Sequence, residues 1–164
     1  MPLTLHSLVF EDHTEIPKYY TGDGEDASPS LQWSGAPPET REYAIICEDP
    51  DAPQSTPFIH WLIYHLPAAS GSLPERLAAQ ETLDIPRRAD QGMNSFGKIG
   101  YGGPLPPVGH GVHRYFFRLY ALNAHLDLEP GATHEQLLGA LEGKILESAQ
   151  LVGTYKREAR KKTG

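Results

Sequence analysis

The sequence has few of the features that mark disulfide-stapled, zinc-binding or nucleic-acid-binding proteins. Cys47 is the only cysteine in 164 residues, so the chain can form neither an internal disulfide nor a cysteine-based zinc site. Lysine and arginine number 14 against 21 aspartate and glutamate residues, which gives a net charge of −7. That balance argues against a nucleic-acid-binding role that rests on general phosphate attraction.

Long apolar runs are missing as well. The longest stretch without Asp, Glu, Lys or Arg covers residues 52–74, and its four prolines and two histidines are incompatible with a membrane-spanning helix. Residues 1–6 (MPLTLH) have neither the basic start nor the apolar length of a signal peptide. We therefore expect a cytoplasmic protein without a membrane span.

Glycine and proline, by contrast, are abundant, with 16 and 15 residues. Such a chain turns often, which favours short strands and ordered loops over long helices. The length of 164 residues predicts a single domain over 1–164. Its last nine residues (156–164) carry five basic side chains and one glutamate, a composition that predicts a solvated, frayed tail. A docking role for this tail is the alternative.

Three segments have the apolar, β-branched and aromatic pattern of buried strands, at residues 42–48 (EYAIICE), 58–66 (FIHWLIYHL) and 113–122 (HRYFFRLYAL). Both faces of the second segment are largely apolar, so we predict a central strand in a sheet that is covered on both sides. Strict alternation would place His60 on the face of Leu62 and Tyr64. In the third segment, alternation places His113 and Tyr115 on one face.

Helical signals are concentrated near the C-terminus. Residues 133–136 (THEQ) form a capping box, and apolar residues then recur at helical spacing, which predicts a helix over 134–150 and a second short helix through 154–162. Residues 72–75 (SLPE) resemble a short helix start, whereas the glycine- and proline-rich stretch 91–109 predicts a long structured loop. The predicted fold class is mainly β with a C-terminal helix.

Polar side chains occur at the ends of the predicted strands. Asp49 and Asp51 follow the first strand, His60 lies within the second, and His113 begins the third. If these strand ends meet at one edge of a sheet, two carboxylates, two imidazoles and the phenol of Tyr115 would line one site. Three prolines stand beside these residues in the sequence, namely Pro53, Pro106 and Pro107. A stiff, apolar prolyl wall suits a preformed pocket for a small ligand.

Each of these residues also has a plainer interpretation. The aspartates of Asp-Pro-Asp favour a turn, and a histidine on an apolar strand is most often a satisfied core residue. A metal site lacks the HxH or HExxH spacing that would support it, and a hydrolase using Asp/His acid–base chemistry lacks a serine or cysteine nucleophile in a recognisable elbow. Four other histidines match no pattern and are interpreted as surface or loop residues: His65, His110, His125 and His134.

Two stretches of the chain resemble signatures of a known family. The first is Asp49-Pro50-Asp51-Ala52-Pro53, followed by Pro57, His60-Trp61 and Leu66-Pro67. The second runs from Gly100-Tyr101-Gly102-Gly103-Pro104-Leu105-Pro106-Pro107 through Gly109 to His113-Arg114-Tyr115. Together they resemble the phosphatidylethanolamine-binding protein family, also called the Raf-kinase-inhibitor-like family, and most closely its short bacterial branch.

This resemblance implies a Greek-key antiparallel β-sandwich with a small anion-binding pocket at one end. Nine residues match pocket positions of the family and are the predicted ligand-binding residues: Asp49, Asp51, Ala52, Pro53, His60, Pro106, Pro107, His113 and Tyr115. No cofactor, metal or catalytic residue is implied. Two aspartates are unusual walls for an anion, which suggests a ligand that is zwitterionic or carries a proton.

The function that follows from the resemblance is non-catalytic binding of phosphate-like anions or phosphoethanolamine-type head groups. A protein partner such as a kinase or a protease is implied as well, and so is a homodimer. Two alternatives stay open at this point, namely a hydrolase that acts on a phosphate ester and an interaction module that works independently of the pocket.

Overall fold

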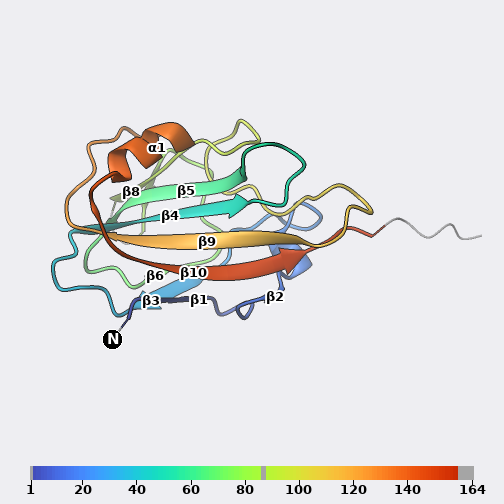
Figure 1. The fold of residues 1–164 in the computed structure, drawn as a ribbon, viewed down its shortest axis with the longest axis horizontal. Helices are drawn as coiled ribbons and strands as arrows, with labels where there is room; N and C mark the ends of the chain where they lie inside the picture. The colour runs from blue at the N-terminus through green and yellow to red at the C-terminus, as the bar shows by residue number, and fades with distance from the viewer. Residues whose placement is uncertain (1, 86–87, 159–164) are drawn as a thin grey trace, which may run out of the picture.

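Two β-sheets of unequal size and one α-helix make up the computed structural model, which describes residues 2–85 and 88–158 (Figure 1). The larger sheet has the strand order β2-β10-β9-β4-β5-β8-β7. Its strands are β2 (Thr14–Glu15), β4 (Glu42–Asp49), β5 (Phe58–Pro67), β7 (Thr82–Asp84), β8 (Arg88–Gln91), β9 (His113–Leu122) and β10 (Ile145–Tyr155). The three strongest strand predictions are thereby confirmed as β4, β5 and β9. Neighbouring strands are antiparallel apart from β2 and β10, which run parallel.

The smaller sheet has three strands in the order β1-β3-β6. They are β1 (Thr4–His6), β3 (Leu31–Ser34) and β6 (Ser72–Leu73), and a short 3-10 helix, η1 (Lys18–Tyr20), follows β2. The helix start predicted at 72–75 is therefore wrong. Leu73 pairs with Leu31 across the ladder and is buried in the core, so burial outweighs the local capping pattern.

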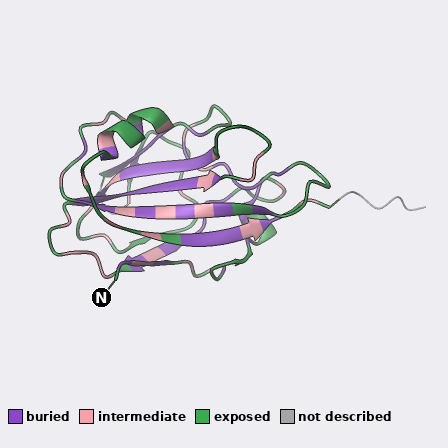
Figure 2. Cartoon of the chain, viewed as in Figure 1, coloured by how far each residue is buried: buried purple, intermediate pink, exposed green. Residues whose placement is uncertain are grey.

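Two hydrophobic cores lie on opposite faces of the larger sheet, as the buried central strands in Figure 2 indicate. The first core fills the space between the sheets and joins Leu31 and Trp33 of β3 to Trp61 of β5. The second lies under the α-helix and joins Leu137 to Leu62 of β5. Because β5 is covered on both sides, it is the central strand that its composition predicted.

Helix α1 (His134–Leu141) is shorter than the sequence predicted. Its capping box at Thr133 and Gln136 is present, but the predicted helix over 134–150 is wrong beyond Leu141. The chain turns at Gly143, where φ is +75°, and then enters β10, which pairs with β9 along its length. The second predicted helix is also wrong over 154–158, because β10 ends at Tyr155 and the next three residues are irregular. The rest of that segment and most of the basic tail lie outside the described residues.

The strict alternation predicted for β5 is broken near its start. Cys47 of β4 pairs with Trp61, but the next residue of β4 pairs with Ile59, so the register shifts by one residue at His60. Ile59 consequently packs in the core of Leu62, whereas Trp61 packs between the sheets. The predicted grouping of His60 with Leu62 and Tyr64 on one face is therefore wrong. The shift leaves His60 beside Tyr115 of β9.

Candidate functional site

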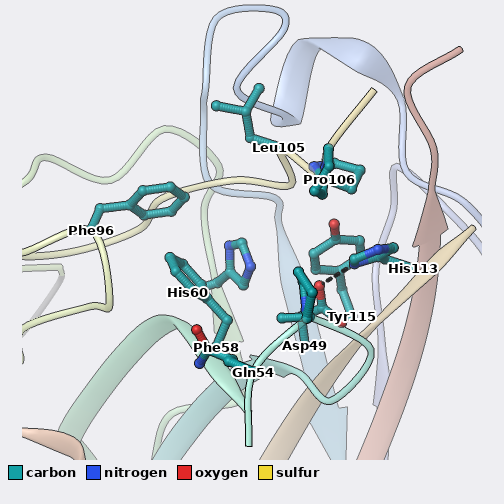
Figure 3. A pocket seen from close by; sticks show the side chains of 12 residues that line it. Asp49, Gln54, Phe58, His60, Phe96, Leu105, Pro106, His113 and Tyr115 are labelled. Atoms are coloured by element: carbon teal, nitrogen blue, oxygen red, sulfur yellow. Dashed lines mark hydrogen bonds and ion pairs between the residues drawn. The ribbon is translucent and has the colours of Figure 1, made fainter. Parts of the chain in front are cut away.

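A cavity of about 260 Å³ opens at the edge of the larger sheet where β4 ends and β5 and β9 begin (Figure 3). The loop after β4 and the loop before β9 close its sides. Twelve residues line it: Asp49, Ala52, Pro53, Gln54, Phe58, His60, Phe96, Leu105, Pro106, Pro107, His113 and Tyr115. The meeting of strand ends that the sequence suggested is thus present, and every predicted site residue except Asp51 lies on the cavity wall.

Asp51 is not among the residues that line the cavity. Its carboxylate accepts three hydrogen bonds from Arg114, namely from the backbone N–H, Nε and Nη2, each at 2.9 Å. These bonds hold the pKa of Asp51 below its usual range. The placement of Asp51 in the pocket is therefore a wrong prediction. The ion pair instead fixes the turn after β4 to the start of β9.

Asp49 is buried and belongs to a carboxylate–imidazole pair. Its Oδ2 lies 2.6 Å from Nδ1 of His113, and its Oδ1 accepts the backbone N–H of Asp51 at 2.7 Å. Both side chains are almost fully buried, with exposed fractions of 4% and 2%. With both oxygens engaged, Asp49 orients the imidazole of His113 and is not presented as a bare negative wall.

The other nitrogen of His113 meets a residue that the sequence did not single out. His110 Nδ1 lies 2.6 Å from His113 Nε2, with the two rings in a T-shaped arrangement. The sequence alone predicts only a surface or loop residue at His110. The available signal was its position three residues before His113, between Gly109 and Gly111.

His60 contributes a neutral imidazole to the cavity. Burial lowers the pKa of His60, although the carbonyl of Gly102, 2.6 Å from Nδ1, acts in the opposite direction. A neutral ring that donates Nδ1–H to this carbonyl keeps a lone pair on Nε2, which can accept a proton-bearing group. Phe96 packs edge-on against the same ring. Gly102 is required here, because a Cβ atom would lie 2.5 Å from the Phe96 ring.

Tyr115 supplies a hydroxyl. Burial and the nearby carboxylate of Asp49 raise the pKa of Tyr115 far above its usual value, so the phenol stays protonated. Figure 3 shows its hydroxyl pointing into the cavity. The remaining wall is mostly apolar and stiff, with Pro53, Pro106 and Pro107 in the predicted places. Four lining residues were not predicted, and their types carry no site-specific signal: Gln54, Phe58, Phe96 and Leu105.

Neither a metal site nor a membrane-spanning helix is found in the part of the chain that the structure describes. Over residues 2–85 and 88–158, no three His, Cys, Asp or Glu side chains are grouped so that they could hold a metal ion. Over the same ranges, every helix is too short or too polar to cross a bilayer. The polar side chains that line the cavity are two imidazoles, a phenol, one carboxylate and the amide of Gln54.

Comparison with known proteins places this architecture in a family. The model of the phosphatidylethanolamine-binding protein family matches residues 6–156. A UPF0098 protein of Methanothermobacter thermautotrophicus is 48% identical over 155 residues, covering 94% of this chain and 99% of the relative. A UPF0098 protein of Aquifex aeolicus is 42% identical, covering 95% and 90%.

Solved structures agree with the family model. The crystal structure of a putative phosphatidylethanolamine-binding protein homologue from Chlamydia trachomatis is similar with a TM-score of 0.84 and 39% identity, covering 95% of this chain and 98% of that one. The structure of Escherichia coli YbcL, described as a member of the mammalian family, has a TM-score of 0.88 at 28% identity and covers 95% and 99%. The chain therefore belongs to the phosphatidylethanolamine-binding protein family.

Proposed function

We propose that the protein is a non-catalytic binding protein whose cavity takes a phosphate monoester, with phosphoethanolamine as the representative ligand. The observation that carries this proposal is the Asp49–His113 pair beside the hydroxyl of Tyr115. An imidazole held by a carboxylate can bear the positive charge that an oxyanion requires, and a phenol adds a second donor.

The neutral imidazole of His60 selects the protonation state of this ligand. Its Nε2 lone pair needs a donor, and a singly protonated phosphate offers a P–OH group for that purpose. A phosphate monoanion would thus donate to His60 and accept from His113 and Tyr115. The cavity of about 260 Å³ is smaller than the usual pocket for a drug-sized molecule, which fits a head group of this size.

Hydrolysis of a phosphate ester is the competing function, because the Asp49–His113 pair could also activate water as a general base. A base that activates water needs a free lone pair, whereas Nε2 of His113 contacts His110 Nδ1 at 2.6 Å and its Nδ1 faces Asp49. The lining residues also include no serine, threonine, cysteine or lysine that could attack phosphorus directly. We therefore favour binding without turnover. The sequence-based expectation that the protein is not an enzyme remains part of this proposal.

A protein partner would reach the same cavity through its rim. Two apolar lining residues, Phe96 and Leu105, are each 41% exposed, so apolar surface lies at the rim of the cavity. Such a rim favours an acidic or phosphorylated partner segment whose charged group enters the cavity while its apolar neighbours contact the rim. A kinase or a protease that carries such a segment is the partner class implied by the family.

Calorimetric titration with phosphoethanolamine tests the proposal. We expect saturable binding with a dissociation constant of about a millimolar or tighter, loss of most of this affinity in His113→Gln, and no release of phosphate from the same ligand over hours. His125→Gln is the matched control, because His125 lies away from the cavity and bonds to Glu42. Phosphate release that disappears in His113→Gln would establish the hydrolase, and equal affinity in both variants would place binding elsewhere.

A further inference from the structure

Resting on the proposed function, the geometry points to His110 as a further residue that controls the anion site, by occupying the nitrogen of His113 that the anion needs. His113 offers two nitrogens, and Asp49 holds Nδ1. Only Nε2 is left for a ligand, and in the structure His110 Nδ1 contacts it at 2.6 Å. Ligand and His110 therefore compete for one atom.

The competition holds for either distribution of protons over the two rings. If His113 is protonated on both nitrogens, its Nε2–H donates to His110 and is unavailable to an oxyanion. If His113 is neutral with the proton on Nδ1, His110 donates to the Nε2 lone pair and no donor faces the ligand. In the first case, the anion binds once the His110 ring has left. In the second case, the ring must leave and Nε2 of His113 must also take up a proton from solvent before it can donate to the anion.

The backbone around His110 is fixed, so this release needs only a rotation of the His110 side chain. The His110 N–H bonds to the carbonyl of Pro107 at 3.1 Å, and the Gly109 N–H bonds to the carbonyl of Arg157 at 2.8 Å. His110 itself is exposed, whereas His113 is 2% exposed. Side-chain rotation at an exposed position is fast compared with ligand binding. His110 therefore changes the affinity of the site for its ligand, and no backbone movement is needed to let the ligand in.

His110 also separates ligands by their charge. An oxyanion forms a charge-assisted hydrogen bond with protonated His113 that is about twice as strong as a neutral one, and it can displace the imidazole of His110. A neutral hydroxyl gains no such advantage over His110. The site therefore stays closed to neutral polar molecules and opens for anions.

Replacement of His110 by alanine should therefore strengthen phosphate binding. The apparent dissociation constant of a site equals its intrinsic value divided by the fraction of protein that is competent to bind. In His110→Ala, the ligand no longer has to break the hydrogen bond between His110 and His113. A net hydrogen bond of ordinary strength corresponds to roughly a two- to tenfold gain in affinity. His110→Asn keeps a short polar group near Nε2 and should gain less. His6→Ala is the matched control, since His6 is an exposed histidine of β1 outside the cavity lining.

Two measurements at a single pH decide the proposal. The first is calorimetric titration of the wild type, His110→Ala, His110→Asn and His6→Ala with phosphoethanolamine. Tighter binding by His110→Ala alone, with His110→Asn between, is expected. Equal or weaker binding by His110→Ala, in a wild type that binds, overturns the control role of His110 while the proposed function stands. No binding by either protein overturns both.

The second measurement observes the contact itself. A nitrogen–nitrogen coupling across the hydrogen bond between His110 Nδ1 and His113 Nε2 should be present in nuclear magnetic resonance spectra of the empty protein. It should disappear at saturation with phosphoethanolamine. A coupling that persists in the saturated protein contradicts the displacement, whatever the affinities.

Discussion

Two histidine–aspartate pairs lie toward opposite ends of β5. The distance between imidazole and carboxylate is the same in both, but the surroundings of the two imidazoles differ. At the cavity end, His113 Nδ1 lies 2.6 Å from Asp49; at the far end, His65 Nδ1 lies 2.6 Å from Asp90. The second nitrogen of His65 bonds to the carbonyl of Leu126 at 2.9 Å. The second nitrogen of His113 meets an exposed side chain beside a cavity.

The difference shows what makes such a pair a candidate site. A backbone carbonyl is a permanent acceptor, so His65 has both nitrogens committed and serves to tie β5, β8 and the loop of Leu126 together. An exposed side chain can be displaced, so His113 keeps one nitrogen available. A carboxylate–imidazole pair thus occurs both at a structural position and at the candidate binding site. The two pairs differ in the partner of the second imidazole nitrogen.

The largest effect is expected at the structural pair. Asp90→Ala removes a carboxylate that is 1% exposed and that bonds to both His65 and Thr82. Breaking a buried pair from one side costs about 3 kcal/mol, so urea denaturation should show that loss in the free energy of unfolding. Asp84→Ala, on the exposed side of β7, should change it by less than about 0.5 kcal/mol. Equal losses of unfolding free energy in the two variants would contradict a structural role for Asp90.

The second prediction concerns binding at the cavity pair. Asp49→Asn replaces the carboxylate that holds Nδ1 of His113 and orients its ring, so affinity for phosphoethanolamine should fall about tenfold, or about 1.4 kcal/mol. Asp90→Asn, at the far pair, should leave the affinity of the folded protein within a factor of two. Calorimetry on both variants makes the comparison, and a loss in Asp90→Asn as large as that in Asp49→Asn would remove the distinction between the pairs.

Two tyrosines should show the same separation between ligand binding and stability, with smaller effects. Tyr115→Phe removes the hydroxyl that faces the cavity, and phosphoethanolamine affinity should fall about fivefold, or about 1 kcal/mol. Tyr64→Phe removes a hydroxyl that donates to Glu129 and accepts from Ala132, so it should lower the free energy of unfolding by about 1 kcal/mol. Each variant should leave the other's property unchanged. Thermal melts and titrations on both variants check this prediction. A loss of affinity in Tyr64→Phe with a loss of stability in Tyr115→Phe would contradict it.

The smallest effect is expected at Asp51, the aspartate outside the cavity. Its pKa is lowered by hydrogen bonds from Arg114, so its stabilisation is fully present above the unfolded pKa of about 3.9 and is lost as the pH falls through the folded value. Because the pair is largely solvent-exposed, Asp51→Asn should cost no more than about 0.5 kcal/mol at neutral pH and nothing in strong acid. Urea denaturation at several pH values checks this, and a loss that grows toward low pH would contradict the sign.

The strands that carry the site could be predicted because their composition is decisive. The segments 42–48, 58–66 and 113–122 have too many β-branched and aromatic residues for any other buried element. The segment 145–155 could not be predicted, because its apolar spacing also fits a helix. Pairing with β9 decides between the two, and such pairing is a long-range interaction that local patterns do not contain.

The site was predictable in type but not in detail. Asp49 and Asp51 stand two residues apart in one motif, and only the fold shows that one turns to His113 and the other to Arg114. His110 was missed because its role depends on a turn that brings its ring back to His113. Contacts of this kind depend on side-chain direction, which sequence spacing alone does not determine.

The most direct test of the account follows both pairs in one titration. Long-range proton–nitrogen spectra resolve the imidazole nitrogens of His113 and His65, and phosphoethanolamine is added to saturation. We expect the signals of His113 Nε2 to shift along a single saturable curve while those of His65 stay in place. Signals of His113 that do not move, in a protein that binds the ligand, would contradict the assignment of the Asp49–His113 pair as the anion site.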